Sequence, residues 1–239
     1  MLDAIDIETF YQHSEPICKL YQSAFELHEK GIHLMSTDEK TAIQALQRTR
    51  ASLPMKPGLV EHQEFEYKRN GTQCLIANLE VATGKIISPT VSKTRTEIDF
   101  ANHIDNTISK DPSASWIFLV DQLNTHQSES LVKLVAKYCQ ITKDLGVKGK
   151  SGILKSKKTR AEFLSHSSHR IRFVYTPKHA SWLNQIECWF SILVRRLLKR
   201  ASFKSEAELK EKILKFIDYF NKTMAKPFKW TYKGRPLTV

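Results

Sequence analysis

Three acidic residues of this chain stand in or beside apolar segments, where a carboxylate is costly to bury. Asp38 ends the run GIHLMSTD, Asp121 ends WIFLVD, and Glu187 lies within SWLNQIECWFSILVRRLL. Carboxylates are the ligands that Mg²⁺ and Mn²⁺ prefer, and two such ions about 4 Å apart can promote phosphoryl transfer. We therefore interpret Asp38, Asp121 and Glu187 as candidate catalytic residues and as ligands of two Mg²⁺ or Mn²⁺ ions.

Each acid also has an ordinary structural explanation. An aspartate at the end of a strand often begins a turn or caps a helix, and this covers Asp38 and Asp121. Helical spacing predicts that Glu187 shares an apolar stripe with Phe190, where a buried carboxylate needs a cationic partner or a metal ion. His126 follows Asp121 closely and is assigned a supporting role, with a hydrogen-bonded structural histidine as the alternative.

Apolar periodicity predicts the elements that position these acids. Helices are expected over residues 8–30, 94–109, 128–139, 182–200 and 205–222, and a capping box is expected from Thr94 and Glu97. Strands are expected in GIHLMSTD, on both sides of a turn at 83–84, in WIFLVD and in IRFVYTP. This order predicts an α/β fold with a mixed five-stranded sheet and helices on both faces. The strands that end at Asp38 and Asp121 are expected to lie side by side.

Composition favours a globular, soluble protein. The 239 residues are 41% hydrophobic and 10% aromatic, enough for a sizeable core. No stretch approaches the roughly 20 apolar residues of a membrane span, and the first residues, MLDAIDIETF, have no apolar signal-peptide segment. The four cysteines lie far apart. Their spacing argues against a cysteine-bound zinc cluster and against a disulfide framework, and indicates a cytoplasmic protein.

Positive charge is concentrated in two blocks of the chain. The net charge is +12, with −4 on residues 1–142, +7 on residues 143–172 and +9 on residues 191–239. Such blocks indicate a polyanionic partner, most simply nucleic acid, with a solvated basic surface as the alternative. The residues expected to contact phosphates are Lys148, Lys150, Lys155, Lys157, Lys158, Arg160, Lys178, Arg195, Arg196, Lys199 and Arg200.

Four segments resemble the DDE transposases of bacterial insertion sequences in the mariner superfamily: STDEKTAIQALQR, YKRNGTQCLIANLEVATGK, FLVDQLNTHQSE and VYTPKHASWLNQIECWFSILVRRLL. The LNxIE core followed by an aromatic-rich helix is the most specific of these. The resemblance implies an RNase H-like fold, with a helical linker segment at residues 1–30 and a catalytic domain at 31–239. The family's catalytic acids fall on the three acids above, with supporting positions at Gln122, Asn124, His126 and Asn184.

The chain departs from the family pattern in three ways. Gln122 stands where the family usually has asparagine, and the 66-residue spacing from Asp121 to Glu187 is longer than in typical mariner proteins. The excess matches a basic insertion at about 141–170, within which residues 143–160 are expected to be a partly mobile loop. The residues before 30 are too few for the family's helix-turn-helix domains. We therefore expect a catalytic domain alone, with a separate helix-turn-helix subunit as a candidate partner.

The resemblance implies a transposase that cleaves double-stranded DNA at element ends and transfers the strand into target DNA. It also implies Mg²⁺ or Mn²⁺ as cofactor, a homodimer on paired ends, and a nucleoid-associated location in the bacterial cytoplasm. Two alternatives stay open. One is a non-catalytic DNA-binding remnant, which Gln122 and the missing recognition domain favour and the intact acids oppose. The other is an RNase H-like nuclease acting on other substrates through the same site.

Overall fold

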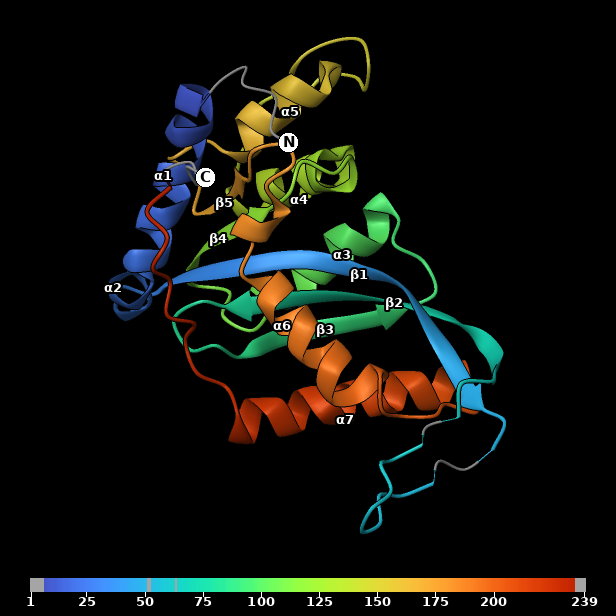
Figure 1. Cartoon of the computed structure of the whole chain (residues 1–239). Helices are drawn as coiled ribbons and strands as arrows, with labels where there is room; N and C mark the ends of the chain where they lie inside the picture. The colour runs from blue at the N-terminus through green and yellow to red at the C-terminus, as the bar shows by residue number, and fades with distance from the viewer. Residues whose placement is uncertain (1–6, 51–52, 63, 235–239) are drawn as a thin grey trace.

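Five strands form one mixed sheet in the order β3-β2-β1-β4-β5 (Figure 1). The structure is a computed structural model that describes residues 7–50, 53–62 and 64–234. β1 pairs antiparallel with β2 and β2 with β3, whereas β1 pairs parallel with β4 and β4 with β5. The strands are β1 (Ile32–Arg48), β2 (Tyr67–Glu80), β3 (Ile86–Ser92), β4 (Ser115–Val120) and β5 (Ile171–Tyr175).

Helices cover both faces of the sheet, as expected. They are α1 (Ile7–Gln22), α2 (Ala24–Glu29), α3 (Glu97–Ile108), α4 (Glu129–Tyr138), α5 (Lys157–Leu164), α6 (Ile186–Leu193) and α7 (Glu206–Thr223). On one face α3, α4 and α5 enclose Trp116 and Phe118 of β4. On the other face α6 and α7 pack on β2 and β3, and α1 and α2 pack on Ile117 and Leu119. Figure 1 shows α6 crossing in front of the sheet with α7 below it.

β4 is the central buried strand that the run WIFLVD predicts. Its side chains alternate between the two cores, because successive residues of a strand point to opposite faces. Every residue from Trp116 to Val120 is buried. The division of the chain at residue 30 stays a prediction; α1 and α2 pack against the sheet through Ile17, Tyr21 and Ala24.

The first strand is longer than predicted. β1 does not end at Asp38 but continues to Arg48, because β2 remains its antiparallel partner along this whole length. The register slips between Lys40 and Ile43, where Ala42 has a φ of 54°. A bulge of this kind bends a strand and is often found beside a functional site. Figure 1 shows β1 bending beyond the body of the sheet.

Several helix predictions are wrong in detail. The expected helix at 182–200 is a 3₁₀ turn (Ser181–Leu183), then α6, then a π-helical turn (Val194–Leu198). The capping box of α3 is formed by Thr96 and Asp99, not by Thr94 and Glu97. The segment 143–160, expected to be loop, is not only loop, because Ser156 caps α5, which begins at Lys157. The helix expected at 8–30 is divided into α1 and α2.

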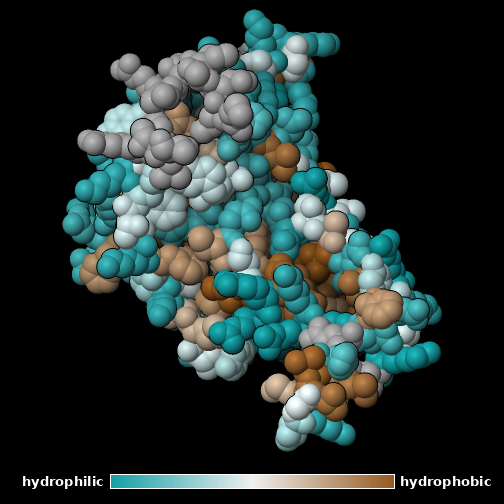
Figure 2. All heavy atoms as spheres, in the orientation of Figure 1, coloured by the Kyte–Doolittle hydropathy of each residue, from teal (hydrophilic) through white to brown (hydrophobic). Residues whose placement is uncertain are grey.

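The loop between β1 and β2 carries exposed apolar side chains. Leu53, Met55, Leu59 and Val60 are each more than 60% exposed. Figure 2 shows apolar surface at the foot of the molecule, where this loop projects in Figure 1. Among the described residues, no helix is long and apolar enough to cross a membrane.

Candidate active site

The parallel pairing of β1 with β4 brings Asp38 beside Asp121. Ser36 of β1 is the register partner of Leu119 of β4, and the two aspartates lie two residues further along each strand. β4 ends at Val120, whereas β1 continues. Asp38 therefore lies within β1, beside the point where its parallel neighbour β4 ends. Ligands and catalytic groups commonly gather beyond the carboxyl ends of parallel strands.

Asp38 is an almost buried carboxyl group with a perturbed proton affinity. It is 8% exposed, and its Oδ1 accepts a hydrogen bond of 2.8 Å from the backbone N–H of Glu39. Burial raises the pKa of Asp38 to about 7; the hydrogen bond from Glu39 lowers this pKa in part, and the negative charge of Asp121 adds to the rise. Two carboxylates held together in this way favour a bound cation, which would remove the repulsion.

His126 joins Asp121 to a second buried acid, Glu39. Its Nδ1 lies 2.8 Å from Asp121 Oδ1, and its Nε2 lies 3.0 Å from Glu39 Oε2. Burial lowers the pKa of His126, but the bonds to Asp121 and Glu39 outweigh burial and raise this pKa to about 10. Partial burial raises the pKa of Asp121, and the bond from His126 holds it below its usual value. The imidazolium therefore keeps Asp121 ionised and fixes its direction.

Sequence reasoning missed Glu39. The side chain of Glu39 is 1% exposed, and it points to the face opposite Asp38 because neighbouring residues of a strand alternate. Its Oε1 is buried without a hydrogen-bond partner in the described structure. Two adjacent acids, Asp38 and Glu39, follow an apolar run in the sequence, and this pair could have indicated that both belong to the site. Only Asp38 was predicted.

Asn184 anchors the start of α6 against β1. It is fully buried, its side-chain amide donates to the backbone oxygen of Thr37 at 2.9 Å, and the same nitrogen lies 3.5 Å from Asp38 Oδ2. Ser36 donates its hydroxyl to Asn184 Oδ1 and accepts from the backbone N–H of Ile186 at 2.8 Å. These contacts fix the first turn of α6, and with it Glu187, on the same face of the sheet as Asp38.

Glu187 is not on the buried stripe that helical spacing predicts. The core side of α6 consists of Ile186, Trp189, Phe190 and Leu193, so Glu187 is rotated to the edge and is half-buried. It lines an open cavity together with Lys40 and Arg195. Within the described part of the chain no ion pair compensates Glu187. The salt bridge considered as its structural explanation is therefore absent there.

The donor set suits hard divalent ions. The ligand atoms of Asp38, Asp121 and Glu187 are not all within 4.8 Å of one another. A site for two ions is wider than a site for one, because the ions themselves lie about 3.5–4 Å apart. The site holds three carboxyl groups, those of Asp38, Asp121 and Glu39, and one Glu39 oxygen has no hydrogen-bond partner. The single positive charge of His126 does not offset their negative charge. The role of Asp38, Asp121 and Glu187 as metal ligands stays a prediction.

The other supporting residues lie around Asp121. Gln122 donates from its side chain to the backbone oxygen of Thr176 at 3.0 Å, which ties the end of β4 to the end of β5. The backbone oxygen of Gln122 accepts from Lys157 Nζ at 2.7 Å. Asn124 is exposed and precedes the 3₁₀ turn that carries His126. This geometry does not test the supporting roles expected of Gln122 and Asn124.

Only some of the predicted phosphate-binding residues lie close to the three acids. Lys157 lies beside Asp121, where its charge helps lower the pKa of that aspartate. Arg195 and Lys199 line the cavity of Glu187. Arg160 donates instead to the backbone oxygens of Gln127 and Leu154. The remaining predicted residues, Lys148, Lys150, Lys155, Lys158, Lys178, Arg196 and Arg200, are exposed.

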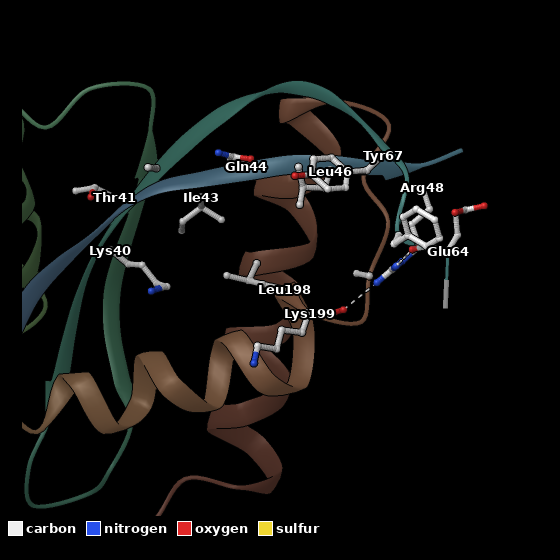
Figure 3. A pocket seen from close by; sticks show the side chains of 13 residues that line it. Lys40, Thr41, Ile43, Gln44, Leu46, Arg48, Glu64, Tyr67, Leu198 and Lys199 are labelled. Carbon is white, nitrogen blue, oxygen red and sulfur yellow. Dashed lines mark hydrogen bonds between the residues drawn. The ribbon is translucent and has the colours of Figure 1, made fainter. Parts of the chain in front are cut away.

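A second depression adjoins the cavity of Glu187. It lies between β1, the chain before β2 and the end of the π-helical turn, and Lys40 and Lys199 line both cavities (Figure 3). Arg48 donates to the backbone oxygen of Lys199 at 3.1 Å and closes its far side. Lys40 and Arg48 were not predicted, because they belong to the acidic half of the sequence and join the basic surface only in three dimensions.

Comparison with protein families matches residues 33–210 to the DDE superfamily endonuclease family. No curated protein sequence matches the chain. The catalytic domain of Mos1 mariner transposase has a similar structure, with a TM-score of 0.53, 11% identity, and coverage of 91% of this chain and 83% of that chain. At this identity the likeness concerns the fold, and it confirms the expected RNase H-like architecture.

Two larger assemblies contain the same fold. A pre-cleavage Mos1 transpososome matches with a TM-score of 0.56 and 12% identity, over 91% of this chain and 56% of that chain. The Mos1 mariner paired end complex with Mn matches with a TM-score of 0.53 and 13% identity, over 88% and 55%. The chain therefore spans about half the length of the proteins in these complexes.

We expect Mn²⁺ to stabilise the protein in a pH-dependent way through Asp38. Without metal, the folded pKa of about 7 exceeds the ordinary value of 3.8, so stability falls as pH rises through this window. Bound Mn²⁺ reverses the trend, since it binds the carboxylate form. Melting temperatures at about pH 5 and about pH 8 measure both effects. Asp38→Asn should abolish them, and the exposed Asp218→Asn should preserve them; pH-independent Mn²⁺ stabilisation contradicts the prediction.

His126→Gln is expected to weaken Mn²⁺ binding by about 10- to 100-fold, the usual cost of losing a residue that orients a ligand. It should also lower the free energy of unfolding by about 3–5 kcal/mol, because buried Glu39 loses its partner. Calorimetry and denaturant unfolding measure the two effects. His166→Gln, at an exposed histidine, is the matched control. Unchanged Mn²⁺ affinity in His126→Gln would refute the assigned role.

Proposed function

We propose that this chain cleaves DNA phosphodiester bonds with the help of divalent metal ions, because it belongs to the DDE superfamily endonuclease family. The observation that best supports this activity is the placement of buried Asp38 of β1 beside Asp121, which follows the carboxyl end of its parallel neighbour β4. The proposed ligands of two Mg²⁺ or Mn²⁺ ions are Asp38, Asp121 and Glu187. Mos1 structures of the same fold are described as containing Mn or Mg.

Bound divalent ions would supply charge neutralisation at phosphorus and a lowered pKa for the attacking water. The protein's own contribution is to hold three carboxylates in place on rigid elements. Asn184 and Ser36 lock α6 to β1 and so set Glu187 relative to Asp38. His126 keeps Asp121 ionised and fixes the orientation of its carboxylate, and Glu39 offsets the charge of the imidazolium. The proposed reaction is in-line displacement at phosphorus, which needs positioning more than covalent catalysis.

The more specific proposal is transposition. Hydrolysis at the end of a mobile element would release a 3′-hydroxyl, and that hydroxyl would attack target DNA in a second displacement. Solved complexes of the same fold are named as a transpososome and a paired end complex. By analogy we propose double-stranded DNA as substrate, two copies of the chain acting on two ends, a separate helix-turn-helix subunit for recognition, and a bacterial insertion sequence as the source.

Surface charge supports the choice of a polyanionic substrate. Lys40, Arg195 and Lys199 surround the cavity that Glu187 lines, and Lys157 lies at the opposite acid, Asp121. Phosphates approaching the three carboxylates would therefore pass cations on both sides.

Two tryptophans lie near Glu187 in the sequence and could in principle stack on a DNA base. Trp182 is 43% exposed but contacts Phe10 and Tyr232, whereas Trp189 is fully buried. Neither tryptophan is proposed to stack on a base.

Asp121→Asn and Glu187→Gln are expected to reduce Mn²⁺-dependent nicking of duplex DNA by at least about 100-fold, since the ions supply several kcal/mol. Both variants should bind DNA like the unchanged protein, as measured by anisotropy. Asp218→Asn, at an exposed residue of α7, should nick at the normal rate. DNA binding without any nicking by the unchanged protein would favour the non-catalytic remnant. Nicking that prefers no DNA end would favour a nuclease with other substrates.

Arg195→Ala and Lys199→Ala are each expected to weaken DNA binding and to reduce the slope of log affinity against log salt concentration by about 0.9, one phosphate contact each. Anisotropy titrations over a series of salt concentrations measure the slope. Lys215→Ala is the control, because Lys215 is exposed on α7 and paired with Glu211. Equal slopes for all three variants would place the DNA elsewhere on the surface.

A further inference from the structure

A second group of potential metal ligands lies away from the three acids. It consists of His28 in α2, His33 near the start of β1 and Glu80 at the end of β2. One ligand atom from each of the three residues lies within 4.8 Å of the other two. Among the described residues this is the group of three that meets that distance. Glu80 is 6% exposed, and a buried carboxylate requires compensation.

The distances in this group fit one small ion. His28 Nδ1 lies 3.5 Å from Glu80 Oε1, and His33 Nδ1 lies 2.7 Å from the same oxygen. Two ligand atoms on a tetrahedral zinc ion, with bonds of about 2.0–2.1 Å, are separated by about 3.4 Å. The distance from His28 Nδ1 to Glu80 Oε1, 3.5 Å, is already close to this value. The His33 separation is that of a hydrogen bond and would open by about 0.7 Å when a metal replaces the shared proton.

His28 offers a ring nitrogen that is free to bind a metal ion. Its Nδ1 is shielded from solvent and has no hydrogen-bond partner in the described structure, although it faces Glu80. A buried polar atom without a partner costs free energy, so an ion between these side chains would relieve the cost. The His28 side chain as a whole is 36% exposed. Solvent can therefore reach the group and supply a fourth ligand.

The surroundings resemble those of a metal site. His33 Nε2 lies 3.5 Å from Asp111 Oδ2, and a ligating histidine commonly donates its other nitrogen to a carboxylate. Thr83 donates its hydroxyl to Glu80 Oε2 at 2.6 Å, which leaves Oε1 directed to the histidines. The His33 ring stacks on Trp116, with ring centroids 4.3 Å apart. Neighbouring side chains thus already orient two of the three ligands, His33 and Glu80.

From this geometry we infer that His28, His33 and Glu80 form a zinc-binding site. Two imidazole nitrogens and one carboxylate oxygen suit Zn²⁺, whereas Mg²⁺ prefers oxygen ligands alone. The site is separate from the three acids, because His33 and Asp38 are five residues apart in β1, about 17 Å at about 3.3 Å per residue. A zinc ion there joins α2 to two neighbouring strands, so its effect is to fasten the N-terminal helices to the sheet.

The test measures Zn²⁺ binding by calorimetry on the whole chain in excess Mg²⁺, which occupies sites made of carboxylates. We expect one Zn²⁺ per chain, and at least a tenfold loss of affinity in His28→Gln and in Glu80→Gln. His62→Gln, at an exposed histidine of the β1–β2 loop, should bind like the unchanged protein. Because His28 is partly exposed, His28→Gln should fold normally, which circular dichroism can check.

Co²⁺ substitution gives an independent readout. A four-coordinate site of this kind gives strong visible absorption with Co²⁺, whereas carboxylate sites that keep several waters give weak absorption. The band should appear with the unchanged protein and with Asp121→Asn, and should vanish in His28→Gln. Loss of the band in Asp121→Asn, normal Zn²⁺ affinity in His28→Gln, or no Zn²⁺ binding at all would each overturn the inference. None of these readouts depends on DNA cleavage.

Discussion

Parallel pairing between β1 and β4 is the constraint on which the candidate site depends. The register that places Ser36 opposite Leu119 also places Asp38 beside Asp121. A slip of one residue would turn Asp38 to the opposite face, because side chains alternate along a strand. The apolar side chains of β4 hold this register, since Trp116 and Phe118 fill one core while Ile117 and Leu119 fill the other. The hydrophobic core therefore sets the distance between two charges.

Negative charge at the site is tolerated because several groups share it. His126 is held as an imidazolium between Asp121 and Glu39, and burial raises the pKa of Asp38 to about 7. Backbone N–H groups add local hydrogen bonds to both aspartates. The negative charge that His126 does not offset faces the open side of the site. Glu187 of α6 lies on that side, and Lys40 and Lys199 line the same cavity as Glu187. The result is an acidic centre inside a basic rim, suited to metal ions and a polyanion together.

Local signals in the sequence predicted much of the fold. A continuous apolar run identified β4, and the segment IRFVYTP identified β5. Ser128 and Ser205 cap α4 and α7 where helical periodicity begins. Prediction was weaker where partners decide the outcome. β1 extends past Asp38 because β2 keeps pairing with it, and Glu187 lies at the edge of its helix because Ser36 and Asn184 fix how α6 begins. Ser36 is 148 residues from Asn184 in the sequence, and a loop separates β2 from β1.

The sequence alone determined which residues carry the acids and where the strand-forming apolar runs lie, because residue identity and short-range periodicity are local properties. Only the tertiary structure decided which charges meet. Glu39 became the partner of His126, Lys40 and Arg48 joined a basic surface although they belong to an acidic segment, and His28, His33 and Glu80 converged from three elements. Such groupings depend on strand register and helix packing, and no local pattern encodes the distance between residues far apart in the chain.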